Sequence, residues 1–227
     1  MKTVEVKGEI IPNDYAIYYD WFGREYTCPA NVKEVLDTLD DGEDLTVEIA
    51  SGGGDVVSGQ TVYSMLKKIS GNHKVTVEVQ SMAASAASMI AMAGDVVKMS
   101  PVALLMIHNA STSIAGDYRD MQHTAEVLQT VNAAIVEAYK NKTGLGDTEL
   151  KEMMDHETWF TANQCVKYGF ADEIIKDEKP SITTNAMIGK LSVTDEMIAK
   201  AKAEMEAKNE EKAVEKEILG DLYMYGF

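Results

Sequence analysis

Apolar and polar positions alternate along several short stretches of the chain, which is the pattern of β-strands with one face buried. The clearest stretch is Lys-Val-Thr-Val-Glu-Val at residues 74–79, and a similar one lies at 45–49. The more continuously apolar runs at 96–99 and 103–107 also predict strands. Between and after them, apolar residues recur at helical spacing and predict helices over 56–69 and 117–142. This interleaving of strands and helices predicts an α/β fold.

The remaining elements are shorter. Residues 3–22 predict a hairpin, because an alternating stretch is followed by a Pro-Asn-Asp turn at 12–14 and an aromatic, strand-like segment. A proline and an asparagine at 29–31 predict the start of a helix that reaches Leu39. Two further short helices are predicted over 147–154 and 161–168.

The strand at 74–79 is followed by a run of small residues, 80–94, in which alanine and serine dominate. We expect a tight turn into a buried helix over 85–93, with one serine at the turn. A hydroxyl there would face free backbone N–H groups and the positive end of the helix dipole, which favour developing negative charge. A nucleophilic serine needs this environment, although a tightly packed core helix whose serines bond to backbone carbonyls gives the same pattern.

Two further segments favour the catalytic interpretation. A Ser-Gly-Gly-Gly turn at 51–54 follows the strand at 45–49, and the apolar run at 104–107 ends in His108. Taken in order, the glycine-rich turn, the serine helix and the histidine strand resemble the proteolytic subunit of the Clp protease family. Gly52 stands where the family has a proline in its Ser-Pro-Gly-Gly turn.

Other motifs of that family can be followed along the chain. Its Ala-Ala-Ser motif, closed nine residues later by glycine, corresponds to 83–85 with Gly94, and its Met-Ile-His motif to 106–108. The later motifs correspond to Thr-Gly at 143–144, Glu-Thr-Trp-Phe-Thr-Ala at 157–162 and Tyr-Gly-Phe-Ala-Asp at 168–172. The resemblance covers roughly residues 5 to 175. It implies the α/β spiral of repeated β-β-α units shared with crotonases, and a protruding handle helix at 117–142 through which subunit rings interdigitate.

The same resemblance suggests the catalytic groups. Ser85 would be the nucleophile and His108 the general base, a role that suits an imidazole because it titrates near neutral pH. By ungapped counting from the Thr-Gly motif, Glu157 occupies the position of the family's aspartate, one methylene longer. Asp155 is the alternative carboxylate, and a Ser–His dyad without a third member stays open. The oxyanion would be bound by the backbone N–H groups of Gly53 and Ala86.

Composition and charge limit the partners and the cellular compartment that we expect for this protein. The 227 residues carry a net charge of −16, which argues against a nucleic-acid or anionic-membrane surface. No apolar run is long enough to span a bilayer, and the N-terminus lacks a signal-peptide pattern. The two cysteines, Cys28 and Cys165, are expected to be reduced thiols of a cytoplasmic protein. We expect no metal and no cofactor, because no His/Cys cluster has ligand spacing.

The character of the chain changes after residue 176. Residues 1–176 are expected to form the protease domain, 177–190 a linker rich in Pro, Ser and Thr, and 191–227 a charged helical tail. The few apolar residues of the tail form only a thin stripe.

These observations predict a serine endopeptidase of the Clp type, assembled as a homo-oligomeric ring and acting on proteins or peptides. The doubled Ala-Ala-Ser at 83–88 and the segment 157–162 resemble the phage head-maturation branch, so we expect phage scaffold or capsid proteins as substrates, in the host cytoplasm or inside a procapsid. The alternatives are a housekeeping subunit fed by an AAA+ ATPase, a crotonase-like acyl-CoA enzyme and an inactive assembly module. The early first strand argues against the housekeeping subunit, because it leaves little room for the family's axial N-terminal loops.

Overall fold

The computed structural model describes residues 2–176, 198–200, 202 and 203. The chain divides into two compact units, one comprising Met1–Ala16 and Glu25–Ile182 and the other Ile17–Arg24 and Thr183–Phe227. All the predicted site residues lie in the first unit. The predicted linker, 177–190, and most of the predicted tail, 191–227, lie outside the described residues, although the few described residues of the tail are helical.

A single eight-stranded sheet organises the described part of the first unit. Its main path has the order β2-β1-β3-β4-β5-β8, with all neighbours parallel. The strands of this path are β1 (Lys2–Ile10), β2 (Tyr26–Thr27), β3 (Leu45–Gly54), β4 (Val75–Ala84), β5 (Val96–Met99) and β8 (Glu173–Ile174). The predicted α/β class is therefore confirmed, and the main path of the sheet is parallel.

Valine side chains in register form the centre of the core. Val4, Val47, Val77 and Val97 are direct partners across β1, β3, β4 and β5, and each is fully buried. β-branched side chains pack well at such positions, and each buried valine contributes about 1.5–3 kcal/mol relative to an exposed one. The alternating pattern that predicted these strands is thus the pattern of their burial.

The long strand β4 has different partners along its two halves. Its first half pairs with β5, while Met82 to Ala84 pair with β6 (Leu104–Ile107), whose other edge pairs antiparallel with β7 (Thr158–Thr161). Because of this change of partner, the C-terminal ends of β4 and β6 lie side by side. As a result, the residue that follows β4 lies close to the residue that follows β6.

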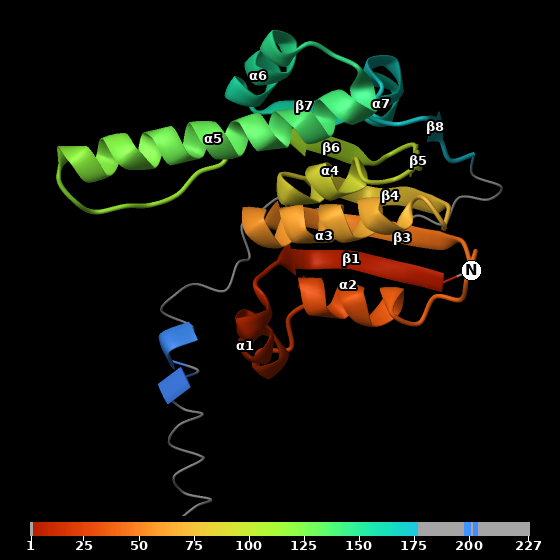
Figure 1. Cartoon of the computed structure of the whole chain (residues 1–227), viewed down its shortest axis with the longest axis horizontal. Helices are drawn as coiled ribbons and strands as arrows, with labels where there is room; N and C mark the ends of the chain where they lie inside the picture. The colour runs from red at the N-terminus through yellow and green to blue at the C-terminus, as the bar shows by residue number, and fades with distance from the viewer. Residues whose placement is uncertain (1, 177–197, 201, 204–227) are drawn as a thin grey trace, which may run out of the picture. The chain divides into compact units, whose positions relative to one another are not determined.

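Helices cover the sheet and lead away from it (Figure 1). α2 (Pro29–Leu36), α3 (Val56–Ile69) and the short α4 (Ala86–Ala91) pack against one another and against the first strands. α6 (Asp147–Asp155) and α7 (Ala162–Tyr168) flank β7. Each of these helices was predicted, with ends that differ by up to three residues.

The long helix α5 (Tyr118–Thr143) has two unlike halves. Its side chains at Ile135, Val136, Ala138 and Tyr139 are buried, whereas its N-terminal half is largely exposed and extends beyond the sheet in Figure 1. The Asp117 carboxylate accepts hydrogen bonds from the N–H groups of Arg119 and Asp120 at the start, and Gly144 ends the helix in the left-handed conformation. These caps stabilise a helix that little packing supports at its free end.

The predicted N-terminal hairpin is wrong. After β1 the chain forms a 3₁₀ turn, η1 (Asn13–Tyr15), and the helix α1 (Ala16–Trp21), in place of a second strand. The partners of β1 are the parallel strands β2 and β3, so its hydrogen bonds are satisfied without a hairpin. The aromatic residues of 15–22 have high strand propensity, but with both edges of β1 occupied they had no strand to pair with.

In the described part of the chain, no helix is long and apolar enough to cross a membrane, and no group of three or more His, Cys, Asp or Glu could hold a metal ion. Cys28 and Cys165 are both free and buried. Burial raises the pKa of the Cys165 thiol to about 12.

Candidate active site

Ser85 connects β4 to α4 in an unusual backbone conformation, with φ of 54° and ψ of −126°. Its N–H donates to the carbonyl of Met106 in β6 at 3.0 Å, which ties the turn to the neighbouring strand. Such a conformation costs a non-glycine residue about 1–3 kcal/mol and persists only where surrounding contacts hold it. The turn leaves the Ser85 side chain half-buried, at the N-terminus of α4.

His108 follows β6 directly and faces this serine. Its Nε2 lies 2.7 Å from the Ser85 Oγ, within hydrogen-bonding distance, and its side chain is also half-buried. An imidazole at this distance can accept the hydroxyl proton when the serine oxygen attacks a carbonyl carbon. The structure therefore brings together the two residues that the sequence singled out from segments 23 positions apart.

The glycine turn at the end of β3 lies against the Ser85 turn. A Cβ atom at Gly53 would lie 2.6 Å from the Ala84 oxygen and from the Ser85 Cβ, and 3.0 Å from the Ala86 nitrogen. Gly53 also has φ of +95°, a conformation that L side chains rarely adopt. Only glycine allows the two backbones to approach this closely.

The two predicted oxyanion donors differ in their present partners. The Gly53 N–H donates to the Ser51 Oγ at 3.1 Å, and the Ser51 hydroxyl in turn donates to the Gly8 carbonyl at 2.6 Å. The Ala86 N–H lies in the first turn of α4, where N–H groups have no acceptor within the helix. Gly53 and Ala86 are thus adjacent to Ser85, but Gly53 would have to exchange one acceptor for another to bind an oxyanion.

The two candidate carboxylates have partners other than the histidine. The antiparallel register of β6 and β7 ends at the pair of Ile107 with Thr158, so His108 and Glu157 are the residues directly beyond that last pair. Glu157 itself has φ of +47°, and its Oε1 accepts a hydrogen bond from the Trp159 indole at 3.3 Å.

Asp155 bonds to a different neighbour of the site. Its Oδ1 accepts from the Asn109 side-chain amide at 2.7 Å. The bonds that the structure gives to the two acids therefore go to Trp159 and Asn109, and neither goes to His108. Ser85 and His108 are brought together, while neither candidate carboxylate is hydrogen-bonded to His108.

Two of the other histidines have partners of their own. The Nδ1 atom of His73 lies 2.9 Å from the Glu43 carbonyl, and that of His156 lies 2.7 Å from the Glu152 carbonyl. These contacts give each ring a local backbone partner.

Sequence reasoning missed the hydroxyl groups that support the site. In the sequence Ser51 stands out only as part of the Ser-Gly-Gly-Gly turn, and Tyr139 does not stand out among the residues of its predicted helix. Both side chains are buried, and the Tyr139 hydroxyl lies 2.9 Å from the Ser88 Oγ. A buried tyrosine normally finds a partner for its hydroxyl, which is the signal that could have drawn attention to it.

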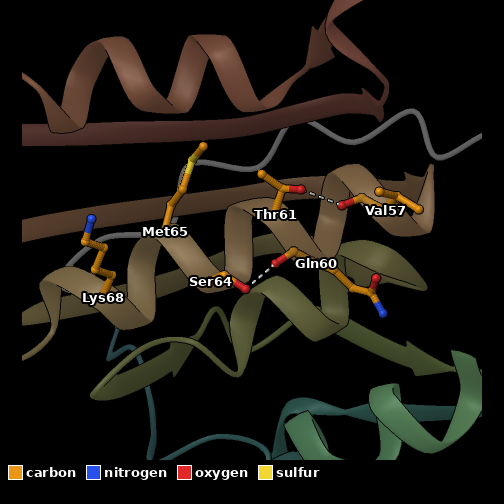
Figure 2. Close-up of a pocket in the computed structure, with 6 residues that line it drawn as sticks. All are labelled: Val57, Gln60, Thr61, Ser64, Met65 and Lys68. Carbon is orange, nitrogen blue, oxygen red and sulfur yellow. Dashed lines mark hydrogen bonds between the residues drawn. The ribbon is translucent and has the colours of Figure 1, made fainter.

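Two surface hollows among the described residues lie away from Ser85 and His108. One of about 400 Å³ follows the outer face of α3 and is lined by Val57, Gln60, Thr61, Ser64, Met65 and Lys68 (Figure 2). A second of about 540 Å³ shares three of these residues and extends to Pro12 and Pro29. Neither is lined by Ser85 or His108, because α3 turns Gly59 toward Ala86 and Met89 of α4 and its other face outward.

Comparison with known proteins shows the family to which the sequence belongs. The family model described as Clp protease matches residues 32–178. The ATP-dependent Clp protease proteolytic subunit of Bacteroides fragilis is 30% identical over 142 residues, which cover 62% of this chain and 68% of the relative. The ATP-dependent Clp protease proteolytic subunit 2 of Thermobifida fusca is 31% identical over 151 residues, covering 66% and 73%.

A third relative extends the match slightly. The ATP-dependent Clp protease proteolytic subunit 1 of Streptomyces avermitilis is 28% identical over 158 residues, covering 67% of this chain and 72% of the relative. The family model spans more than half of the chain, and the matched region contains the Ser85 turn, His108 and both candidate carboxylates. The chain therefore belongs to the Clp protease family and is a serine peptidase of the Clp type.

Proposed function

We propose that this peptidase cleaves protein chains through an acyl-enzyme formed on Ser85, with His108 as the general acid and base. The observation that carries the proposal is the 2.7 Å separation between the Ser85 Oγ and the His108 Nε2. In the first step the serine oxygen attacks the scissile carbonyl and the imidazole takes its proton. The imidazolium then protonates the leaving amine, and the acyl-enzyme is hydrolysed by the reverse sequence with water.

The negative oxygen formed in each step needs backbone donors. We assign this role to the N–H groups of Ala86 and Gly53, which belong to the two turns in closest approach. For this the Gly53 N–H exchanges the Ser51 Oγ for the substrate oxygen. Glu157 is the proposed orienting carboxylate, because it stands directly before β7, while His108 stands directly after β6, the strand that pairs with β7.

We further propose phage scaffold or capsid proteins as the substrates. The support is the doubled Ala-Ala-Ser at 83–88 and the segment 157–162, which resemble the head-maturation branch of the family. The second candidate is a proteolytic subunit fed by an AAA+ ATPase, and it is favoured by the names of the three relatives, each described as ATP-dependent. Cleavage of a folded scaffold protein without nucleotide would favour the first, and strict dependence on an ATPase and ATP would favour the second.

The nucleophile is tested by covalent labelling. We expect a fluorophosphonate to modify Ser85 and Ser85→Ala to lose peptidase activity by a factor on the order of 10⁴ or more, as for other serines of catalytic triads. Ser81→Ala is the matched control, since Ser81 is an exposed serine of the same segment, and it should keep both labelling and activity. Adducts mapped to Ser81 or Ser88 would contradict the assignment.

A further inference from the structure

A buried hydrogen-bond chain connects α5 to the backbone of Ser85. The Ser88 hydroxyl, on α4, lies 2.6 Å from the Ser85 carbonyl oxygen and 2.9 Å from the Tyr139 hydroxyl. Ser88 is fully buried and Tyr139 is 1% exposed, so water does not compete for these groups. The chain therefore runs from the protruding helix, through α4, to the proposed nucleophile.

The direction of the two bonds follows from the number of protons. A carbonyl oxygen only accepts, so the single Ser88 proton is donated to Ser85. The Tyr139 hydroxyl must then donate to the Ser88 Oγ. Burial raises the pKa of the Tyr139 hydroxyl, which keeps its proton in place as the donor.

The Ser85 carbonyl and the Ala86 N–H belong to the same planar peptide group. Fixing the direction of the carbonyl therefore fixes the direction of the N–H on the opposite side of the plane, which is the proposed oxyanion donor. The carbonyl also accepts from the N–H groups of Ser88 and Met89, at 3.0 and 3.4 Å, and the Ser88 hydroxyl bond is the shortest of the three. Hydrogen bonds in such a chain polarise one another and strengthen the terminal donor.

We propose that Ser88 and Tyr139 are positioning residues that orient the Ser85–Ala86 peptide toward the oxyanion. The inference rests on the proposed function, since it gives a role to residues behind the same site. Neither side chain touches the substrate. Both act through the peptide group, so they contribute when the oxyanion forms and not when the substrate binds.

The principal test is Tyr139→Phe. The ring keeps its edge-to-face contact with Phe170, at 5.9 Å between centroids, and loses only the hydroxyl. We expect kcat on a short peptide to fall roughly three- to tenfold with KM unchanged within about twofold. The reason is that the variant lacks the buried hydrogen bond from Tyr139 to Ser88, which helps to orient the Ala86 N–H. The rate of fluorophosphonate labelling of Ser85 should fall by the same factor.

Ser88→Ala and the double variant measure the coupling. Ser88→Ala should reduce kcat at least as much as Tyr139→Phe, since it removes both side-chain bonds. Because Tyr139 acts through Ser88, the double variant should lose no more activity than Ser88→Ala alone, within about twofold. Additive losses would overturn the inference.

Tyr63→Phe is the matched control. Tyr63 also contacts α5, through a hydrogen bond to Asn141, but this bond does not reach Ser85. It should leave kcat and labelling unchanged, while thermal unfolding midpoints measured for all variants report any purely structural cost. An equal loss in Tyr63→Phe, or wild-type kcat and labelling in Tyr139→Phe, would overturn the inference.

The two proposals fail differently. Absence of labelling at Ser85 in the wild-type protein would reject the proposed function, and the inference with it. Normal labelling of the wild type together with an unaffected Tyr139→Phe variant would reject the inference alone.

Discussion

Ser85 is held in its strained conformation by bonds on both sides of its Cα atom. Its N–H is bonded to β6, and its carbonyl accepts from the Ser88 hydroxyl and from the N–H groups of Ser88 and Met89 in α4. Each bond contributes about 1 kcal/mol net, which together offsets the cost of the conformation. In this conformation the Ser85 Oγ lies 2.7 Å from the His108 Nε2, so the strained backbone holds the hydroxyl within reach of its proposed base.

Glu157 is the residue whose role the geometry leaves most open to test. We expect Glu157→Gln to reduce kcat on the order of 10²-fold, because the amide keeps the shape but cannot stabilise the imidazolium. Asp155→Asn should cost less than about tenfold, since the hydrogen bond of Asp155 goes to Asn109 and not to His108. Steady-state kinetics of both variants decide the matter.

The opposite order of effects would transfer the orienting role to Asp155. If neither variant lost more than about threefold, the Ser–His pair would operate as a dyad. Both variants keep side-chain size nearly unchanged, so unfolding midpoints close to wild type are the appropriate check on structure.

At the scale of elements, the contact between the two turns is the most constrained feature. Gly53→Ala would place a methyl group 2.6 Å from Ser85 Cβ and from the Ala84 oxygen, so one turn must move. We expect kcat/KM to fall by a factor on the order of 10² or more, because the proposed nucleophile and both oxyanion donors lie in these turns.

Gly52→Ala is the control for this prediction. A Cβ atom at Gly52 meets only the flexible end of Met82, at 3.6 Å, which is an ordinary contact. Peptidase assays should therefore find Gly52→Ala within about threefold of wild type. Similar losses in both variants would show that the turn is sensitive to any side chain and not to the approach at Gly53.

The sequence predicted the elements whose pattern is local. The predicted bounds of the helix at 56–69 and the strand at 96–99 agree with the structure, because the apolar pattern of each depends only on residues close together in the sequence. β7 was not predicted, and β4 runs through Ala84, five residues beyond its predicted end. Both depend on pairing with β6, a partner distant in sequence, and alanines have little strand propensity of their own.

Some residues of the candidate site could likewise be identified from the sequence, and others could not. Ser85 and His108 could be selected because each lies at the end of a predicted element and matches a motif. The relation of Ser51 to Gly53, and of Tyr139 to Ser88, could not be selected, because a hydroxyl shows its role only when the tertiary fold supplies its partner. The carboxylate stayed ambiguous for the same reason.

For the whole molecule, the exposed half of α5 favours assembly. Tyr118, Met121 and Val127 are 77%, 44% and 46% exposed on a helix that leaves the body of the first unit. We predict a homo-oligomeric ring in which these surfaces are buried between subunits, as the family resemblance implies. Val127→Glu should shift native mass spectra toward smaller species, because a charge buried at an interface without a partner is strongly unfavourable.

Gln122→Glu provides the comparison, since it adds the same charge at an exposed polar position of the same helix. It should leave the distribution of species unchanged. A wild-type protein that is monomeric under conditions in which it cleaves peptides would contradict the predicted ring.

The buried cysteines have a consequence for how the enzyme would meet oxidants and electrophiles. The thiolate is the form that peroxide and alkylating agents attack, and the Cys165 thiol, with its raised pKa and no exposed surface, stays protonated at neutral pH. Cys28 is likewise enclosed, with its Sγ 2.8 Å from the Asn31 side-chain oxygen. Oxidants that inactivate cysteine proteases should therefore leave the peptidase activity of this protein unchanged. Iodoacetamide at neutral pH should likewise inhibit a contaminating thiol protease in the same preparation but not this peptidase.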